Sequence, residues 1–188
     1  SCFTISNRSI TTTIVTTNMT FPITESYGVK LIEVLTGFKF IADKIKELEG
    51  KEVFIGGGEE SYGYMLNMDV RDKDGVTAAV LTAEMALYNF ARGKSLLDYL
   101  NEIYEKYGFF MEAPLSITLK GQSGADRIKE IMAEFRTAKP ETLGGIKVAS
   151  VTDFKEGAVI EGLRLDSSDV LRFELEDESR VTVRPSGT

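Results

Sequence analysis

Residues 56–64, with the sequence GGGEESYGY, carry side chains suited to binding a polar ligand. They place two adjacent carboxylates and a hydroxyl on a backbone that glycines make flexible. They follow the apolar run 53–55, which predicts a buried strand, and open α/β sheets bind ligands where strands end. In extended chain Glu59 and Ser61 would project from one face, with Glu60 on the other. Such a pair could hold two neighbouring hydroxyls of a sugar; the alternative is an acidic turn.

A second candidate binding segment is RPSGT, residues 184–188. Arg184 offers a guanidinium that can bind an anion in a bidentate manner, and Ser186 and Thr188 offer hydroxyl donors. Gly187 lets backbone N–H groups come close to a phosphate. This composition is typical of an anion site, and the alternative is a loose turn that contains an arginine.

Thr36 and Gly37 stand where a helix is predicted to begin. The first N–H groups of a helix have no partner within it, and Lys39 in the first turn adds positive charge. This position therefore favours an anionic ligand. The alternative is that Thr36 simply caps the helix and Lys39 is solvated.

Composition narrows the classes of function. The chain has 188 residues, 43% of them hydrophobic and 27% charged, which is typical of a globular protein with one large or two small domains. A formal charge of −7 argues against a nucleic-acid surface, and the absence of histidine argues against histidine catalysis and histidine zinc sites. The single cysteine, Cys2, fits a reducing cytoplasm. We find no apolar run typical of a membrane span and no signal peptide, and we expect the chain to be part of a longer protein.

The predicted secondary structure around these motifs alternates between strand and helix in the first part of the chain. Strands are predicted at 11–16, 29–34 and 53–55. Helices are predicted after Thr36, at 75–91 and at 95–107. The first of these should have an apolar face, formed by Phe38, Ile41, Ile45 and Leu48. In the second of these helices we expect five side chains to point inward: Val76, Ala79, Val80, Ala83 and Leu87. The alternation predicts an α/β domain over residues 1–113, with a mixed, mostly parallel sheet flanked by helices.

After residue 113 the pattern changes. We predict a strand at 115–119, a helix around 125–135, a strand at 146–151 and a final hairpin whose second strand leads into RPSGT. In that hairpin Leu171, Phe173 and Leu175 should face one side. Residues 114–188 are therefore expected to form a smaller α+β domain, incomplete at its end.

Four motifs in this order resemble the α-D-phosphohexomutase family: TGFKFI at 36–41, GGGEESYGY at 56–64, RDKDG at 71–75 and RPSGT at 184–188. The strings GEESYGY and VRDKDG resemble the phosphoglucomutases and phosphopentomutases of this family more than the phosphomannomutases. The resemblance covers essentially the whole chain. It implies the family's third domain over residues 1–113 and its fourth over the remainder.

The resemblance also implies a role for each site residue. Glu59 and Ser61 would hold sugar hydroxyls, and Thr36 and Gly37 would contact substrate. Lys73 would lie near the reacting phosphate as a possible catalytic group; the alternative is a charged turn in which Asp72 or Asp74 caps the next helix. The group that would clamp the phosphate that is not being transferred consists of Arg184, Ser186, Gly187 and Thr188.

A protein of this family would be a cytoplasmic isomerase of carbohydrate metabolism. It would interconvert glucose 1-phosphate and glucose 6-phosphate through a phosphoserine and a bisphosphorylated sugar. A phosphopentomutase, a phosphomannomutase and a phosphosugar-binding module without catalysis remain open. The expected partner is a phosphorylated hexose or pentose, with no nucleic acid and no membrane.

Two motifs of the family are missing from the sequence. A serine segment like TASHNP would carry the phosphate, and a DGDxDR segment would bind magnesium. Mg²⁺ and glucose 1,6-bisphosphate are therefore expected cofactors of the whole enzyme. This chain is expected to bind neither cofactor and to be inactive by itself.

Overall fold

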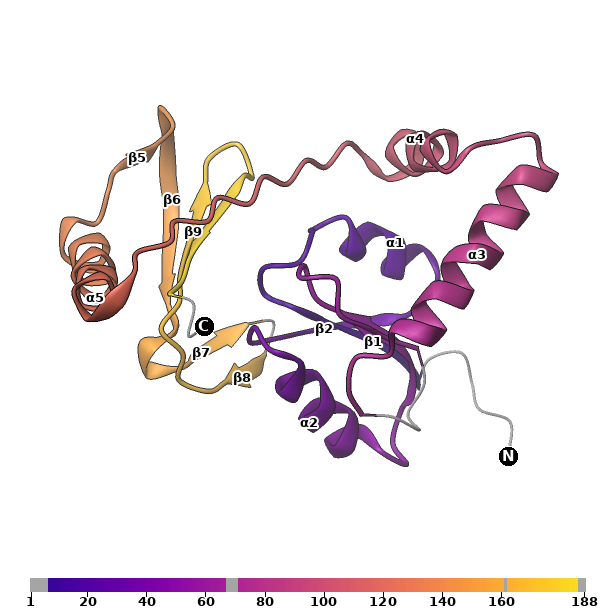
Figure 1. The fold of residues 1–188 in the computed structure, drawn as a ribbon, viewed down its shortest axis with the longest axis horizontal. Helices are drawn as coiled ribbons and strands as arrows, with labels where there is room; N and C mark the ends of the chain where they lie inside the picture. Colours follow the sequence, from indigo (N-terminus) through magenta and orange to yellow (C-terminus); the bar gives the residue numbers. More distant parts are fainter. Residues whose placement is uncertain (1–6, 67–70, 161, 186–188) are drawn as a thin grey trace. The chain divides into compact units, whose positions relative to one another are not determined.

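The computed structural model describes residues 7–66, 71–160 and 162–185. The chain divides into two compact units, and the boundary falls between Ala113 and Pro114. The first unit is an α/β arrangement with a mixed sheet, and the second is an α+β arrangement (Figure 1). No helix in these described ranges is both long and apolar enough to span a bilayer.

The sheet of the first unit is parallel at its centre and has an antiparallel strand at one edge. Its order is β2-β1-β3-β4; β1 pairs in parallel with β2 and β3, and β4 pairs antiparallel with β3. The strands are β1 (Arg8–Thr13), β2 (Lys30–Val34), β3 (Val53–Gly58) and β4 (Tyr64–Met65). The mixed, mostly parallel sheet that the sequence predicts is present. The first strand lies earlier than predicted because residues 14–16 form a turn.

Two helices make the parallel connections. Helix α1 (Thr20–Ser26) joins β1 to β2, and α2 (Phe38–Leu48) joins β2 to β3. The chain thus crosses the sheet first in one direction and then in the other, and right-handed connections of this kind place successive helices on opposite faces. Figure 1 shows α1 and α2 on the two sides of β1 and β2. The predicted apolar face of α2 is buried through Phe38, Ile41 and Ile45.

The start of α2 differs from the prediction that Thr36 caps it. Gly37 occupies the N-cap position with a φ of 123°, and no side chain caps the helix. Glycine adopts this backbone geometry without steric cost, which moves the cap position past Thr36. The hydroxyl oxygen of Thr36 is instead buried, with no hydrogen-bond partner in the described part of the chain.

The next two helices begin where capping residues predict them. Helix α3 (Gly75–Ala91) has Asp74 as its N-cap, whose carboxylate accepts hydrogen bonds from the N–H groups of Val76 and Thr77. Helix α4 (Leu96–Tyr107) has Ser95 as its N-cap, and Ser95 forms a capping box with Asp98. These bonds satisfy N–H groups that have no partner within the helix.

The prediction of an inward-facing stripe on α3 is wrong. All five side chains expected to point inward are exposed, with Val76 at 75% and Leu87 at 67%. Apolar residues lie all around α3, so their spacing does not select one face, and the described part of the chain covers little of this helix. Within this helix, whose residues are all described, only Asn89 is buried.

The second unit is an antiparallel sheet with one long helix. The sheet has the order β10-β9-β6-β5, and a separate pair joins β7 to β8. Helix α5 (Gly121–Ala138) precedes them. The strands are β5 (Thr142–Leu143), β6 (Ile146–Asp153), β7 (Ala158–Ile160), β8 (Leu163–Leu165), β9 (Leu171–Leu175) and β10 (Arg180–Val183), with a 3-10 turn, η2 (Phe154–Glu156), after β6.

The core of the second unit forms between α5 and β9. Met132 of α5 packs with Leu171, Phe173 and Leu175, which confirms the predicted face of the hairpin. The predicted strand at 115–119 is absent, since residues 108–120 contain no strand. Leu115 is 87% exposed there, because alternating residues form a strand only where another strand supplies hydrogen-bond partners.

Candidate functional site

The three parallel strands of the first unit end at one edge of the sheet, and the predicted motifs follow them. Residues 14–16 follow β1, Thr36 and Gly37 follow β2, and Glu59 follows β3. The direction of the connections reverses beside β1, which lies between β2 and β3. Open α/β sheets bind ligands outside the carboxyl ends of their strands at such a reversal. This edge is therefore the candidate site.

The GGGEESYGY segment forms a tight hairpin between β3 and β4. The N–H of Glu59 donates to the carbonyl of Gly63 over 2.9 Å, and residues 60–62 form the turn. Tyr62 has a left-handed φ of 65°. A hairpin loop of three residues commonly ends with a residue in this conformation.

The expectation that Glu59 and Ser61 alternate along an extended strand is wrong. The strand ends at Gly58 and the chain reverses at once, so the two side chains have different surroundings. Glu59 is only 7% exposed, whereas Ser61 lies exposed in the turn. The turn therefore holds the carboxylate inside and offers the hydroxyl to solvent.

The buried carboxylate of Glu59 has a partner from another motif. Its Oε1 lies 3.9 Å from Nζ of Lys73, and the exposed fractions of the two side chains are 6% and 57%. The backbone beside Lys73 is fixed, because the N–H of Asp74 donates to the carbonyl of Tyr64 over 2.8 Å. The structure thus brings together two residues from separate sequence motifs, and the lysine remains accessible to a ligand.

Gly63 allows this pair to form. A Cβ atom at Gly63 would lie 2.8 Å from Oε1 of Glu59 and 2.9 Å from Cδ of Lys73. Both distances are shorter than normal contacts, so any larger residue would displace both side chains. Sequence reasoning did not single out Gly63, although its place in GGGEESYGY could have suggested a close approach.

The start of α2 supplies hydrogen-bonding groups at the same edge of the sheet. With Gly37 at the N-cap, the first N–H groups of α2 receive no side-chain cap. The adjacent hydroxyl of Thr36 is buried and has no partner among the described residues. Lys39 lies in the first turn, with Nζ 4.7 Å from the centre of the Phe40 ring. Backbone donors, a hydroxyl and a cation can together accept an anionic or polar ligand.

The RDKDG turn is held in place by its own aspartates. Hydrogen bonds from the backbone and hydroxyl of Thr77 lower the pKa of Asp74 below its ordinary value, so the cap of α3 stays ionised. Asp72 accepts a hydrogen bond from the N–H of Lys73 over 2.7 Å. Both aspartates thus accept hydrogen bonds from backbone N–H groups around Lys73, while the side chain of Lys73 extends to Glu59.

In the second unit, Arg184 directly follows β10 and is exposed. The other residues predicted for the phosphate clamp, Ser186, Gly187 and Thr188, lie outside the described residues. Strand β10 itself is fixed by pairing with β9, where Val183 lies opposite Leu171. Arg184 is therefore presented at the end of a strand that is anchored in the core.

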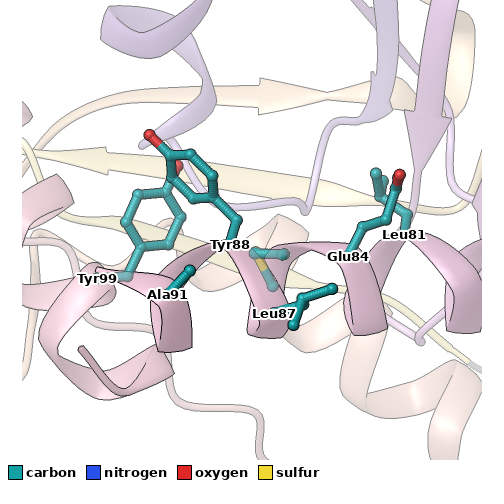
Figure 2. Close-up of a pocket in the computed structure, with 7 residues that line it drawn as sticks. Leu81, Glu84, Leu87, Tyr88, Ala91 and Tyr99 are labelled. Carbon is teal, nitrogen blue, oxygen red and sulfur yellow. The ribbon is translucent and has the colours of Figure 1, made fainter. Parts of the chain in front are cut away.

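A separate hollow lies on the helices of the first unit. Figure 2 shows side chains of α3 and of Tyr99 from α4 around it. Its lining is formed by Leu81, Glu84, Met85, Leu87, Tyr88, Ala91 and Tyr99. Glu84 is the only charged side chain of this lining. The described residues of the hollow therefore offer no cation to an anionic ligand, whereas the sheet edge carries Lys39 and Lys73.

Comparisons with known proteins agree with the fold described above. The family model for phosphoglucomutase/phosphomannomutase, alpha/beta/alpha domain III, matches residues 4–107. A phosphoglucomutase of Staphylococcus aureus strain N315 is 35% identical over 97% of the chain, and one of Staphylococcus epidermidis strain RP62A is 33% identical over the same share. The chain spans about a third of these curated relatives, 34% of each.

A solved structure gives the same fold. It is from Thermus thermophilus, is described as a phosphomannomutase, and superposes with a TM-score of 0.53 at 19% identity. The match covers 95% of this chain and 32% of that one. The family model covers more than half of the sequence. The chain therefore belongs to the phosphoglucomutase/phosphomannomutase family, the α-D-phosphohexomutases, and residues 4–107 are a domain III of that family.

Proposed function

We propose that this chain is the sugar-recognising and phosphate-clamping part of a phosphoglucomutase. The complete enzyme would interconvert glucose 1-phosphate and glucose 6-phosphate through a phosphoserine and a bisphosphorylated sugar. The observation that carries this proposal is the Glu59–Lys73 pair at the carboxyl edge of the sheet, with a buried carboxylate beside an accessible ammonium. The identities to staphylococcal phosphoglucomutases support the choice of glucose.

In this proposal Glu59 accepts hydrogen bonds from sugar hydroxyls. An ionised carboxylate has two acceptor oxygens, and hydrogen bonds to a charged group are stronger than neutral ones. Low exposure of Glu59 strengthens each bond further, because little water competes. Ser61, at the exposed tip of the same turn, offers a second group to the sugar.

Lys73 contributes charge and a proton donor. Its ammonium carries three N–H donors and lies within ion-pair distance of Glu59. A phosphate placed against its exposed side would be attracted to it, as it would be to the uncapped N–H groups of α2. Thr36 would give its hydroxyl, and Gly37 would let the ligand approach the backbone.

Arg184, Ser186, Gly187 and Thr188 would clamp the phosphate that is not being transferred. A guanidinium binds a phosphate through two parallel hydrogen bonds. Because the two ends of the sugar react in turn, one set of residues must bind the sugar hydroxyls and another must bind the phosphate that is not being transferred. We assign the first role to the sheet edge and the second to RPSGT.

The described residues of this chain do not fit Mg²⁺. No group of three acidic, cysteine or histidine residues within the described ranges is arranged to hold a metal ion. We therefore derive no step through a metal from this chain. Mg²⁺, glucose 1,6-bisphosphate and the phosphoserine would belong to the remaining two thirds of a full-length enzyme.

The test uses the full-length protein that contains this chain, supplied with Mg²⁺ and glucose 1,6-bisphosphate. We expect conversion of glucose 1-phosphate to glucose 6-phosphate, and less efficient conversion of ribose 1-phosphate and mannose 1-phosphate. A preference for either competitor would identify a phosphopentomutase or a phosphomannomutase instead. Binding of phosphosugars without any turnover would identify a binding module.

A further inference from the structure

A buried threonine at the end of β1 contacts the turn that carries Glu59. Thr13 is fully buried, and its hydroxyl donates a hydrogen bond to Oε2 of Glu60 over 2.9 Å. The two residues are 47 positions apart in the chain. The bond is therefore a tertiary contact that ties the β3–β4 turn to the neighbouring parallel strand.

The direction of the hydrogen bonds at Thr13 follows from the groups involved. An ionised carboxylate can only accept, so the single hydroxyl proton of Thr13 goes to Glu60. The hydroxyl of Thr16 lies 3.0 Å from that of Thr13 and must therefore donate to it. The N–H of Thr13 in turn donates to the Thr16 hydroxyl over 3.2 Å. The turn after β1 thus orients the Thr13 hydroxyl toward Glu60.

We propose that Thr13 is a positioning residue: through Glu60 it fixes the turn that holds the Glu59 carboxylate against Lys73. The backbone of the turn is closed by the bond from Glu59 to Gly63, and Tyr62 is in a conformation that costs free energy for a side-chain-bearing residue. A turn under such strain needs further contacts to keep one shape. The bond from Thr13 supplies one from outside the turn.

The two adjacent carboxylates consequently have different roles. Glu59 is buried and faces Lys73, whereas Glu60 is held by the threonine of β1. The role in sugar binding rests on the proposed function, but the anchoring of the turn does not.

Three substitutions in β1 separate this role from general stability. Thr13→Val removes the hydroxyl and keeps the shape, and Thr13→Ser restores the hydroxyl. Thr11→Val is the matched control: Thr11 is also fully buried in β1, but its hydroxyl has no hydrogen-bond partner among the described residues. All three variants are made in the full-length protein, and melting temperatures are recorded for each.

For Thr13→Val we expect KM for glucose 1-phosphate to rise about fivefold with kcat changed less than about twofold, as for the loss of one hydrogen bond that supports substrate binding. Thr13→Ser should return KM to near the wild-type value, and Thr11→Val should leave it unchanged. An unchanged KM in Thr13→Val, or an equal rise in Thr11→Val, would overturn the proposal.

Hydrogen exchange separates this inference from the proposed function. In the 188-residue chain without ligand, the Glu59 amide should exchange about fivefold faster in Thr13→Val than in Thr11→Val, because its bond to Gly63 opens more often. If exchange is faster in Thr13→Val but the full-length protein does not convert glucose phosphates, the positioning role of Thr13 is supported and the proposed phosphoglucomutase activity is rejected. Equal exchange in the two variants would reject the positioning role of Thr13, whether or not the full-length protein is active.

Discussion

Two acidic turns of the molecule share one backbone geometry but have different surroundings. In the β3–β4 turn the N–H of Glu59 bonds the carbonyl of Gly63, and in the β9–β10 turn the N–H of Leu175 bonds the carbonyl of Ser179. The third residue of each loop is left-handed, with φ values of 65° at Tyr62 and 69° at Glu178. Backbone geometry alone therefore does not distinguish the candidate site from an ordinary surface hairpin.

The side chains of the two turns do distinguish them. In the β9–β10 turn Asp177 accepts hydrogen bonds from the N–H and hydroxyl of Ser179, within the turn. Glu176 forms an ion pair with exposed Lys147. In the β3–β4 turn the acids reach Lys73 and Thr13, and Glu59 is buried. Burial of charge is costly unless pairing compensates, and Lys73 supplies such a partner to Glu59, whereas the acids of the β9–β10 turn are exposed.

Among the predicted substitutions in the two turns, a side chain added at Gly63 should have the largest effect on catalysis. In Gly63→Ala the added Cβ would meet Glu59 and Lys73 at distances too short for contact, so the carboxylate must move. We expect kcat/KM for glucose 1-phosphate to fall on the order of a hundredfold, since misplacement of a binding group by about 1 Å has effects of this size. Steady-state kinetics of the full-length protein measure this fall.

The matched control is Ser179→Ala, at the equivalent position of the other turn, where the chain already accommodates a Cβ. It should leave kcat/KM unchanged. Wild-type activity in Gly63→Ala, with a normal melting curve, would show that the Glu59–Lys73 pair is not needed in its observed form.

Neutralising Glu59 should have the next largest effect. Glu59→Gln keeps the size of the side chain but replaces the proposed charged hydrogen bonds to sugar hydroxyls, each of about 1.5 to 3 kcal/mol, with neutral ones. We expect catalytic efficiency to fall by about tenfold or somewhat more. Glu176→Gln in the other turn removes only an exposed ion pair and should not change catalysis. Equal behaviour of the two variants would place Glu59 outside the site.

Arg184 tests what the second unit contributes, because it follows the strand that leaves the β9–β10 turn. Arg184→Ala should weaken binding of glucose 1-phosphate by about tenfold through loss of a bidentate contact to phosphate. Binding of unphosphorylated glucose should not change. Calorimetric titration of both ligands measures the difference. If wild-type protein binds glucose as tightly as glucose 1-phosphate, RPSGT is not a phosphate clamp.

Local features of the fold were predictable from the sequence. The apolar face of α2, the cap of α3 at Asp74 and the buried face of β9 each depend on residues close together in the chain, so their spacing predicts them. The exposure of α3 was not predictable in this way, because the spacing of residues in a helix that is apolar all around does not indicate which faces the rest of the chain covers.

The geometry of the candidate site was predictable only in part. Motifs indicated Glu59 and Lys73 separately, but their contact depends on the hairpin that reverses the chain after Gly58. The bond from Thr13 to Glu60 joins residues 47 positions apart, and no local pattern in a single sequence encodes such a distance. The start of α2 was mispredicted because a glycine with positive φ displaced the expected threonine cap.

The smallest predicted effect concerns the shared backbone of the two turns. Tyr62→Gly and Glu178→Gly each replace a left-handed residue and so remove about 1 to 2 kcal/mol of steric strain from the folded state. Each glycine also stabilises the unfolded state by about 0.5 to 1 kcal/mol, because it gives that state more conformational entropy. Tyr62 is 88% exposed and loses few contacts. Both variants should therefore raise the free energy of unfolding by about 0.5 kcal/mol in urea titrations. Stabilisation at Glu178 without stabilisation at Tyr62 would mean that contacts from outside, such as the one from Thr13, already set the shape of the β3–β4 turn.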